Sequence, residues 1–284
     1  MAEPFGSIDF RHFAPLKSTI TGIAANSAYA ASYGLSNLSE CVMDIPTFEL
    51  ALDRAEVSHA VLVPGAATNE ELADYVARST RLFGISGLDD ALKSGRDMRA
   101  EVALCSAMGF HLCGLAPYLH RAAANDRMFY PIYESCCETG MGVVLHSSFH
   151  MNAALPIKYS SPIHLDDVAR DFPTLPIVAS HGGWPWMDDM VAVAWRHANV
   201  FIEISGQRNR YVAESGSGWE LLFYYMNGPL RDKVIWGSTW PYLPVERQKA
   251  ELDLIPVKAE IKDKLLKHNP RRILQACGAI PSSG

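Results

Sequence analysis

The chain has 284 residues, of which 49% are hydrophobic and 20% are charged, and its formal net charge at pH 7 is −6. This is the composition of an ordinary globular protein, and its acidic balance argues against nucleic acid or an anionic membrane as a partner. No apolar run approaches the roughly 20 residues that cross a bilayer. The N-terminal stretch MAEPFGSIDF also lacks the basic and apolar regions of a signal peptide. We therefore expect a cytoplasmic protein.

Short apolar runs alternate with helical patterns along the whole chain. The eight predicted strands cover residues 7–10, 60–63, 82–88, 110–116, 143–146, 176–179, 200–204 and 234–236. The predicted helices cover residues 47–55, 69–79, 98–108, 125–138, 164–172, 184–197, 217–227, 244–252, 258–267 and 269–276. Such alternation indicates a parallel sheet, and eight units without a glycine-rich nucleotide loop predict an α/β protein, a (β/α)₈ TIM barrel. No linker or repeat divides the sequence, so one domain over residues 1–284 is expected.

One segment of the chain departs from this alternation, and the cysteines follow no regular spacing. Residues 16–44 are rich in Ala, Ser, Gly and Asn and lack a sustained period, so we expect a long loop that covers the barrel mouth as a lid. Six cysteines are scattered without C-x-x-C spacing. In a chain without an export signal these cysteines are expected to be reduced.

The stretch VASHGGWPW carries the first candidate for chemistry. An apolar strand ends at His181, two glycines follow, and a helix with two early aspartates begins at Trp184. In barrels of parallel strands the carboxyl ends of the strands carry the active site. We therefore predict His181 as a catalytic residue, with Gly182 and Gly183 leaving room for a ligand. The alternative is a histidine that caps a helix or satisfies a core hydrogen bond.

Other strand ends supply further candidates. His146 ends the strand over residues 143–146 and matches His181 in position, and Arg11 follows the first strand. An arginine side chain matches a carboxylate in two parallel hydrogen bonds. The predicted substrate-binding residues at the remaining strand ends and loops are Tyr118, Ser147, Trp184, Arg208, Thr239 and Trp240. Three other histidines are expected on the surface or in loops, namely His12, His120 and His150.

Several segments resemble a known family. IDFRHFAP near the start, HGGWPW in the middle and NPRRIL near the end are similar to the amidohydrolase-2 branch of the amidohydrolase superfamily. That branch includes aminocarboxymuconate-semialdehyde decarboxylase, resorcylate decarboxylases and pyrone-dicarboxylate lactonase. The resemblance covers nearly the whole chain and implies a distorted (β/α)₈ barrel. It also implies a small, planar, carboxylated substrate and a homodimer.

The metal-binding positions of that family are altered in this chain. Metal-dependent members carry D-x-H-x-H on the first strand and an Asp in G-S-D-x-P after the last. Here Arg11 and Phe13 replace the two histidines and Thr239 replaces the Asp, so His146 and His181 are the ligands that remain. A zinc site needs at least three protein ligands. We therefore predict no metal and no cofactor, unless a bulge in the first strand turns His12 inward.

The sequence leaves three functions open. The leading hypothesis is metal-independent hydrolysis of a lactone, an ester or an activated ring-derived bond. In it one histidine activates water and Arg11 stabilises the developing negative charge. The alternatives are non-oxidative decarboxylation of an aromatic acid and a barrel that binds such an acid without turnover. Of the two histidines, we rank His181 first, because the serines after His146 could hold that ring in an orienting role.

Overall fold

The computed structural model describes residues 6–281, without the side chains of residues 27–29, and shows a single barrel of eight parallel strands in the order β1 to β8. The strands are β1 (Ile8–Phe13), β2 (His59–Val63), β3 (Leu82–Gly87), β4 (Leu112–Leu115), β5 (Gly142–His146), β6 (Ile177–Ser180), β7 (Val200–Ile204) and β8 (Val234–Trp236). Hydrogen bonds between β1 and the segment after β8 close the barrel, because Phe13 N donates to Trp240 O over 2.9 Å. The predicted fold is confirmed, and each predicted strand is present.

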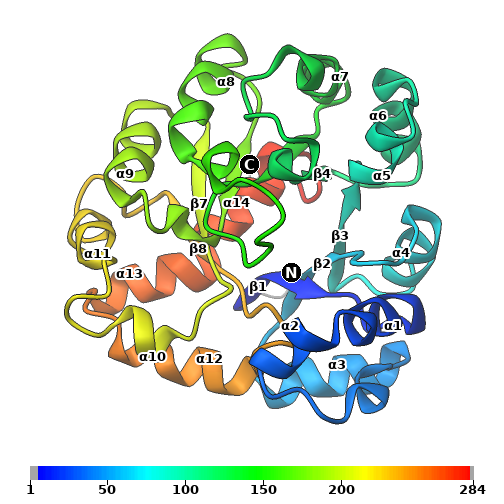
Figure 1. The fold of residues 1–284 in the computed structure, drawn as a ribbon. Helices are drawn as coiled ribbons and strands as arrows, with labels where there is room; N and C mark the ends of the chain where they lie inside the picture. Colours follow the sequence, from blue (N-terminus) through cyan, green and yellow to red (C-terminus); the bar gives the residue numbers. More distant parts are fainter. Residues whose placement is uncertain (1–5, 282–284) are drawn as a thin grey trace.

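Helices surround the strands on the outside (Figure 1). They are α3 (Ile45–Arg54), α4 (Asn69–Val76), α5 (Asp89–Lys93), α6 (Met98–Ala107), α7 (Tyr130–Thr139), α8 (Leu165–Asp171), α9 (Met187–Arg196), α10 (Asn209–Val212), α11 (Glu220–Met226), α12 (Val245–Glu251), α13 (Ala259–Asp263) and α14 (Asn269–Ala276). Local sequence sets their starts. Thr68 and Glu71 form a reciprocal capping box at the start of α4. The helix predicted to begin at Trp184 begins at Met187, with Asp188 and Asp189 in its first turn.

The barrel interior is apolar at one end and open at the other. Inward side chains of the strands pack with Ile273, Leu274 and Cys277 of α14 in one buried cluster. His111, just before β4, shares a hydrogen bond of 3.0 Å with Cys277 O, so α14 lies against the amino ends of the strands. In Figure 1 α14 is seen behind the strands near the centre of the view. The carboxyl ends of the strands are therefore the end that is free to hold a site.

The segment over residues 16–44 is helical, so the predicted irregular loop is wrong in its secondary structure. It forms α1 (Lys17–Ala25), α2 (Ser27–Ser32) and the short 3₁₀ helix η1 (Leu38–Cys41). Ile20 and Ile23 are three residues apart on one face of α1 and pack with Tyr242 and Leu243 after β8. These helices are too short to show a sustained period in the sequence, which explains the wrong prediction.

A bulge in β1 decides which of its side chains face inward. Asp9 pairs with Ala60 and His12 pairs with Leu62, so two residues of β1, Phe10 and Arg11, lie opposite one residue of β2. Phe10 packs in the interior cluster and Arg11 lines the cavity above it.

The bulge leaves His12 facing outward. The His12 ring stacks on Trp240 with ring centroids 4.5 Å apart. Burial in this apolar setting lowers the pKa of His12 to about 3. His12 is therefore a buried side chain of the outer core. It is neither the surface histidine we expected nor a residue turned toward the barrel interior.

Two further properties of the chain follow from the described residues. All six cysteines are free, as predicted. No helix within residues 6–281 combines the length and the apolar character needed to cross a bilayer.

Candidate active site

A cavity of about 950 Å³ lies at the carboxyl ends of the strands. Six of the predicted site residues line it: Arg11, Tyr118, His146, His181, Trp184 and Thr239. Three residues that were not predicted to bind substrate also line it, namely Tyr33, His150 and Tyr242. Its volume suits a small organic ligand.

The two histidines predicted as catalytic lie side by side in this cavity. The ring centroids of His146 and His181 are 5.0 Å apart. Burial, followed by the nearby Arg11 charge, lowers the pKa of His146 to about 3. Burial likewise takes the pKa of His181 well below its ordinary value. Both imidazoles are therefore neutral near pH 7, able to accept a proton or to donate one N–H hydrogen bond.

The two rings differ in their hydrogen bonds. His181 Nδ1 shares a hydrogen bond of 2.9 Å with the hydroxyl of Ser205. His146 Nδ1 is buried and has no partner among the described residues. The serines after His146 do not hold its ring, since Ser147 donates to Leu145 O and Ser148 donates to Trp184 O. The prediction that these serines orient the His146 ring is wrong, and it is His181 that has the orienting partner.

Two strand ends carry a left-handed backbone at residues other than glycine. His181 has φ of +68° and Thr239 has φ of +63°. This conformation is costly for a β-branched residue such as threonine. Hydrogen bonds on both sides of Thr239 hold it: its N–H donates to Arg11 O over 2.8 Å, and its hydroxyl accepts from Gly206 N over 2.8 Å. Such strain concentrates at functional sites.

The glycines at this end of the barrel leave room for protein side chains. A Cβ on Gly182 would lie 2.2 Å from Trp219, and one on Gly183 would lie 2.6 Å from Met190. These two glycines admit core side chains, so the prediction that they leave room for a ligand is wrong. A Cβ on Gly206 would lie 2.8 Å from His181 Nδ1, so Gly206 is the glycine that makes space for the histidine.

A buried carboxylate lies beside Arg11. Glu203 on β7 is 1% exposed, and neither carboxylate oxygen has a hydrogen-bond partner among the described residues. A Cβ on Gly237 would lie 2.6 Å from Arg11 Cβ and 3.1 Å from Glu203 Oε1, so the two side chains pass each other at this glycine. Burial raises the pKa of Glu203, and the Arg11 charge acts in the opposite direction. Sequence reasoning missed Glu203, although a charged residue inside the apolar run 200–204 was a visible signal.

Tyr118 and His150 form one wall of the cavity. Their rings stack with centroids 4.0 Å apart, and the Tyr118 ring meets His146 edge-on at 4.7 Å. His150 lies in a loop, as expected, but it is only 7% exposed and is therefore not a surface residue.

The His120 side chain is also buried, and it binds the Asp89 carboxylate over 2.8 Å. This pair supports the turn that carries Tyr118, and His120 is therefore not a surface histidine either.

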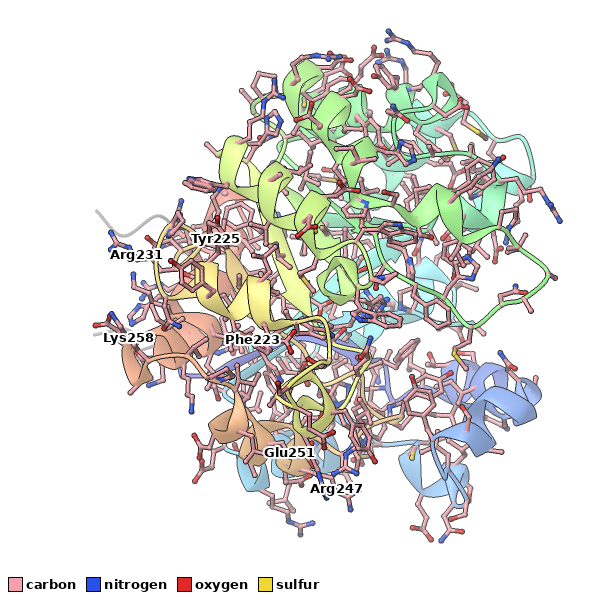
Figure 2. All side chains as sticks on the ribbon, turned by 60° about the vertical axis from the view of Figure 1, so that its left-hand side comes forward. Phe223, Tyr225, Arg231, Arg247, Glu251 and Lys258 are labelled. Atoms are coloured by element: carbon pink, nitrogen blue, oxygen red, sulfur yellow. The ribbon has the colours of Figure 1, made fainter. Side chains whose placement is uncertain are left out.

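Three of the predicted substrate-binding residues do not line the cavity. The Arg208 side chain pairs with Glu251 of α12, which lies beside α10 on the outer side of the barrel in Figure 2. Trp240 stacks on His12 instead. Ser147 is buried and bonded to Leu145 O. All three lie at strand ends or in loops, as expected. Their side chains point away from the cavity, because each contacts a neighbouring group instead: a carboxylate, a ring or a backbone carbonyl.

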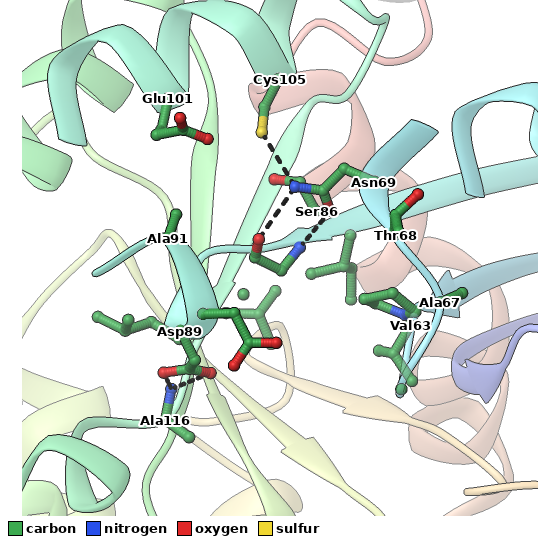
Figure 3. Close-up of a pocket in the computed structure, with 18 of the residues that line it drawn as sticks. Val63, Ala67, Thr68, Asn69, Ser86, Asp89, Ala91, Glu101, Cys105 and Ala116 are labelled. Carbon is green, nitrogen blue, oxygen red and sulfur yellow. Dashed lines mark hydrogen bonds between the residues drawn. The ribbon is translucent and has the colours of Figure 1, made fainter. Parts of the chain in front are cut away.

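A second cavity of about 560 Å³ meets the first at Arg11, Tyr118 and His146. It extends between α4 and α6 past the ends of β2 to β4. Its polar lining is largely satisfied within the protein. The Asn69 amide exchanges two hydrogen bonds with the backbone of Gly87, and Asp89 accepts from Ala116 N, as the dashed lines in Figure 3 show. The site thus has a wide main cavity and a narrower side arm.

The side chains in the main cavity do not suit a divalent metal. Within residues 6–281 no group of three or more His, Cys, Asp or Glu side chains is placed to hold one. Three imidazoles line the cavity, those of His146, His150 and His181, but they are not grouped to hold one ion. The Arg11 cation lies close enough to His146 and His181 to lower both pKa values. A positive charge in this place repels a dication and attracts an anion.

The chain matches one protein family by sequence and several solved structures by fold. The sequence profile described as amidohydrolase matches residues 46–276, and the chain belongs to this family. No curated protein matches the chain. The solved structures it resembles include an uncharacterised TIM-barrel protein from Bordetella bronchiseptica, with a TM-score of 0.79, 22% identity, and 96% of this chain and 99% of the other covered.

Two further structures of similar fold carry a functional name. One is the 5-carboxyvanillate decarboxylase of Sphingomonas paucimobilis, with a TM-score of 0.67, 16% identity and 95% and 98% of the two chains covered. The other is a probable 2-pyrone-4,6-dicarboxylic acid hydrolase of Acinetobacter baumannii with citric acid bound, with a TM-score of 0.64, 16% identity and 96% and 99% coverage. At these identities the likeness establishes a shared fold.

Proposed function

We propose that this protein is a metal-independent hydrolase that opens a lactone, an ester or an activated ring-derived bond in a small carboxylated ring compound. One observation carries the proposal: Arg11 and two neutral imidazoles, those of His146 and His181, converge on one cavity at the carboxyl ends of the strands. This arrangement offers an anion-binding group beside a proton acceptor, without a set of metal ligands.

The cavity lining favours a planar acid as the substrate. Arg11 supplies a fixed positive charge, which a substrate carboxylate can bind with two parallel hydrogen bonds. Tyr118 and Trp184 offer aromatic surface beside it. The proteins of similar fold act on acids of this kind, a carboxyvanillate and a pyrone dicarboxylic acid, and one of them binds citric acid. A ring acid therefore agrees with both the charge and the shape of the site.

The reaction needs one proton acceptor and one anion-stabilising group. His181 Nε2 accepts a proton from water as the water oxygen bonds to the substrate carbonyl carbon, and the carbonyl oxygen takes up the electron pair. Arg11 stabilises the negative charge that develops on this oxygen. When the carbonyl reforms, the bond to the ring oxygen breaks, and the His181 imidazolium returns its proton to that oxygen. The products are a carboxylic acid and an alcohol or enol.

The two histidines are uncharged in the unliganded site, because burial and the Arg11 charge lower both pKa values. An uncharged imidazole can accept a proton from water, as the hydrolysis requires. Decarboxylation of an aromatic acid is the second candidate, and the similarity in fold to a decarboxylase favours it.

Product analysis on a panel of lactones, aryl esters and hydroxybenzoates tests the proposal. We expect ring-opened or hydrolysed acid from at least one lactone or ester, with no carbon dioxide released. Release of carbon dioxide from a hydroxybenzoate would instead establish the decarboxylase. Saturable binding by calorimetry with no product from any compound would establish a binding protein. Arg11→Ala should weaken the activity or the binding in each case, which ties the result to this cavity.

A further inference from the structure

His181 shares a hydrogen bond with Ser205, which lies beside the buried carboxylate of Glu203. The His181 Nδ1 and Ser205 Oγ atoms are 2.9 Å apart. The Ser205 side chain and the backbone N–H of His181 lie beside the Glu203 carboxylate. Glu203 and Ser205 are two residues apart at the end of β7, and both are buried. A carboxylate, a hydroxyl and an imidazole thus follow one another from the barrel interior to the cavity.

The unmet hydrogen-bonding capacity of Glu203 assigns the direction of these contacts. Neither of its oxygens has a partner within hydrogen-bond geometry among the described residues, and a buried carboxylate without hydrogen bonds is costly. The Ser205 side chain lies close enough to lower the pKa of Glu203, and a rotation of either side chain would bring the single Ser205 hydroxyl proton to this carboxylate. If that proton serves Glu203, Ser205 Oγ must accept from His181, and His181 must carry its proton on Nδ1.

We propose that Ser205 and Glu203 are positioning residues that fix His181 in its Nδ1–H tautomer, which leaves Nε2 as the proton acceptor that faces the cavity. The proposal deepens the proposed function, because it names the atom that acts as base. Gly206 fits this arrangement, since any side chain there would collide with the ring at Nδ1. His146 has no equivalent positioning contact, since its Nδ1 has no partner among the described residues.

Nitrogen NMR tests the tautomer without any substrate. Long-range ¹H–¹⁵N correlation spectra of the wild-type protein, assigned with His181→Gln, should show His181 protonated on Nδ1 and unprotonated on Nε2. Ser205→Ala should abolish this pattern and Ser205→Thr, which keeps the hydroxyl, should retain it. Glu203→Gln should shift His181 toward the Nε2–H form, because an amide can donate to Ser205 Oγ and free the serine proton for Nδ1. Ser135→Ala, at a buried serine of α7, is the matched control and should leave the His181 signals unchanged.

Kinetics on a substrate found in the panel give the second readout. Ser205→Ala should lower kcat by about 10-fold or more with little change in KM, the usual scale for a lost partner of a functional histidine, and Ser205→Thr should restore it. A wild-type His181 with its proton on Nε2, or spectra that Ser205→Ala and Glu203→Gln leave unchanged, would overturn the proposal. The NMR result stands even when no compound in the panel is turned over, so failure of the proposed function is distinguishable from failure of this inference.

Discussion

Arg11 faces the cavity because β1 holds one residue more than its neighbour at the bulge. Without that residue, the alternation of a strand would place Arg11 and Phe10 on opposite faces. The backbone is fixed further by Arg11 O, which accepts from Thr239 N over 2.8 Å. An arginine held this way, with its Nε buried and without a partner among the described residues, is ready for an anionic ligand.

Replacing Arg11 tests this assignment. Arg11→Ala should raise the Kd or KM for a carboxylated compound about 10- to 100-fold, because a hydrogen bond to a charged group contributes about 1.5–3 kcal/mol. Arg11→Lys should recover part of the loss, since it keeps the charge but loses the planar fork. Calorimetry measures both. Arg196→Ala, which removes the same charge from the exposed side of α9, should leave the affinity unchanged.

The two histidines should differ in their effect on turnover. His181→Ala should lower kcat by about 10²-fold or more, the usual contribution of an acid–base group. His146→Ala should cost less, because no described group orients its Nδ1 for a single role. His268→Ala, at an exposed position, is the control for loss of a histidine. A folded His181→Ala protein that turns over within a few-fold of wild type would show that His181 is structural.

At the scale of elements, the seam between β1 and β8 depends on the buried carboxyl of Asp9. It accepts hydrogen bonds from the backbone N–H and the hydroxyl of Ser238 and from Arg11 N. These bonds hold the segment that carries Thr239 against the end of β1. Burial nevertheless outweighs them and raises the pKa of Asp9 to about 7.

This raised pKa predicts a pH-dependent contribution to stability. In the unfolded chain Asp9 ionises near its ordinary pKa of 3.8, whereas in the folded chain it keeps its proton up to about pH 7. The stabilisation is therefore complete below pH 3.8 and is lost as the pH rises through about 7. The wild-type advantage in free energy of unfolding over Asp9→Asn should shrink by about 2–3 kcal/mol between pH 5 and pH 8. Urea unfolding at the two pH values measures it, and an advantage that grows with pH would contradict the assignment.

The segment over residues 16–44 is the element that we expect to respond to ligand. Tyr33, which follows α2, donates from its hydroxyl to Gly206 O over 3.0 Å, and its ring lies against Tyr242 with centroids 5.2 Å apart. Limited proteolysis of residues 16–44 should slow when a carboxylated ring compound binds. Tyr33→Phe should weaken that protection about 5-fold, because one hydrogen bond contributes about 1 kcal/mol. Tyr224→Phe, on the exposed face of α11, is the control. Cleavage rates that do not change when the ligand binds would show that residues 16–44 do not respond to ligand.

At the scale of the whole molecule, the sequence predicts the barrel better than it predicts the site. Six of the eight strands, all except β1 and β4, end at or one residue before a proline, glycine, histidine or serine, so most repeats of this pattern are visible without a structure. The positions of His146 and His181 follow from the same pattern. The homodimer and the cytoplasmic location stay predictions.

Side-chain direction at strand ends is what the sequence cannot supply. Arg208 and Trp240 occupy the expected loops but turn to Glu251 and His12, partners that are distant in sequence or on another strand. His150 enters the cavity because its loop folds back onto Tyr118. The period of a strand predicts which face a residue occupies only until a bulge intervenes, as it does before His12.

We propose that this family member works through Arg11 and two imidazoles rather than through a metal. The most direct test is the turnover of the hydrolysed compound by protein that has been treated with a strong chelator, together with the metal content of the same sample by elemental analysis. We expect unchanged turnover with only a small fraction of a metal ion per chain. Turnover that is lost to the chelator and restored by zinc or manganese, at about one ion per chain, would contradict it.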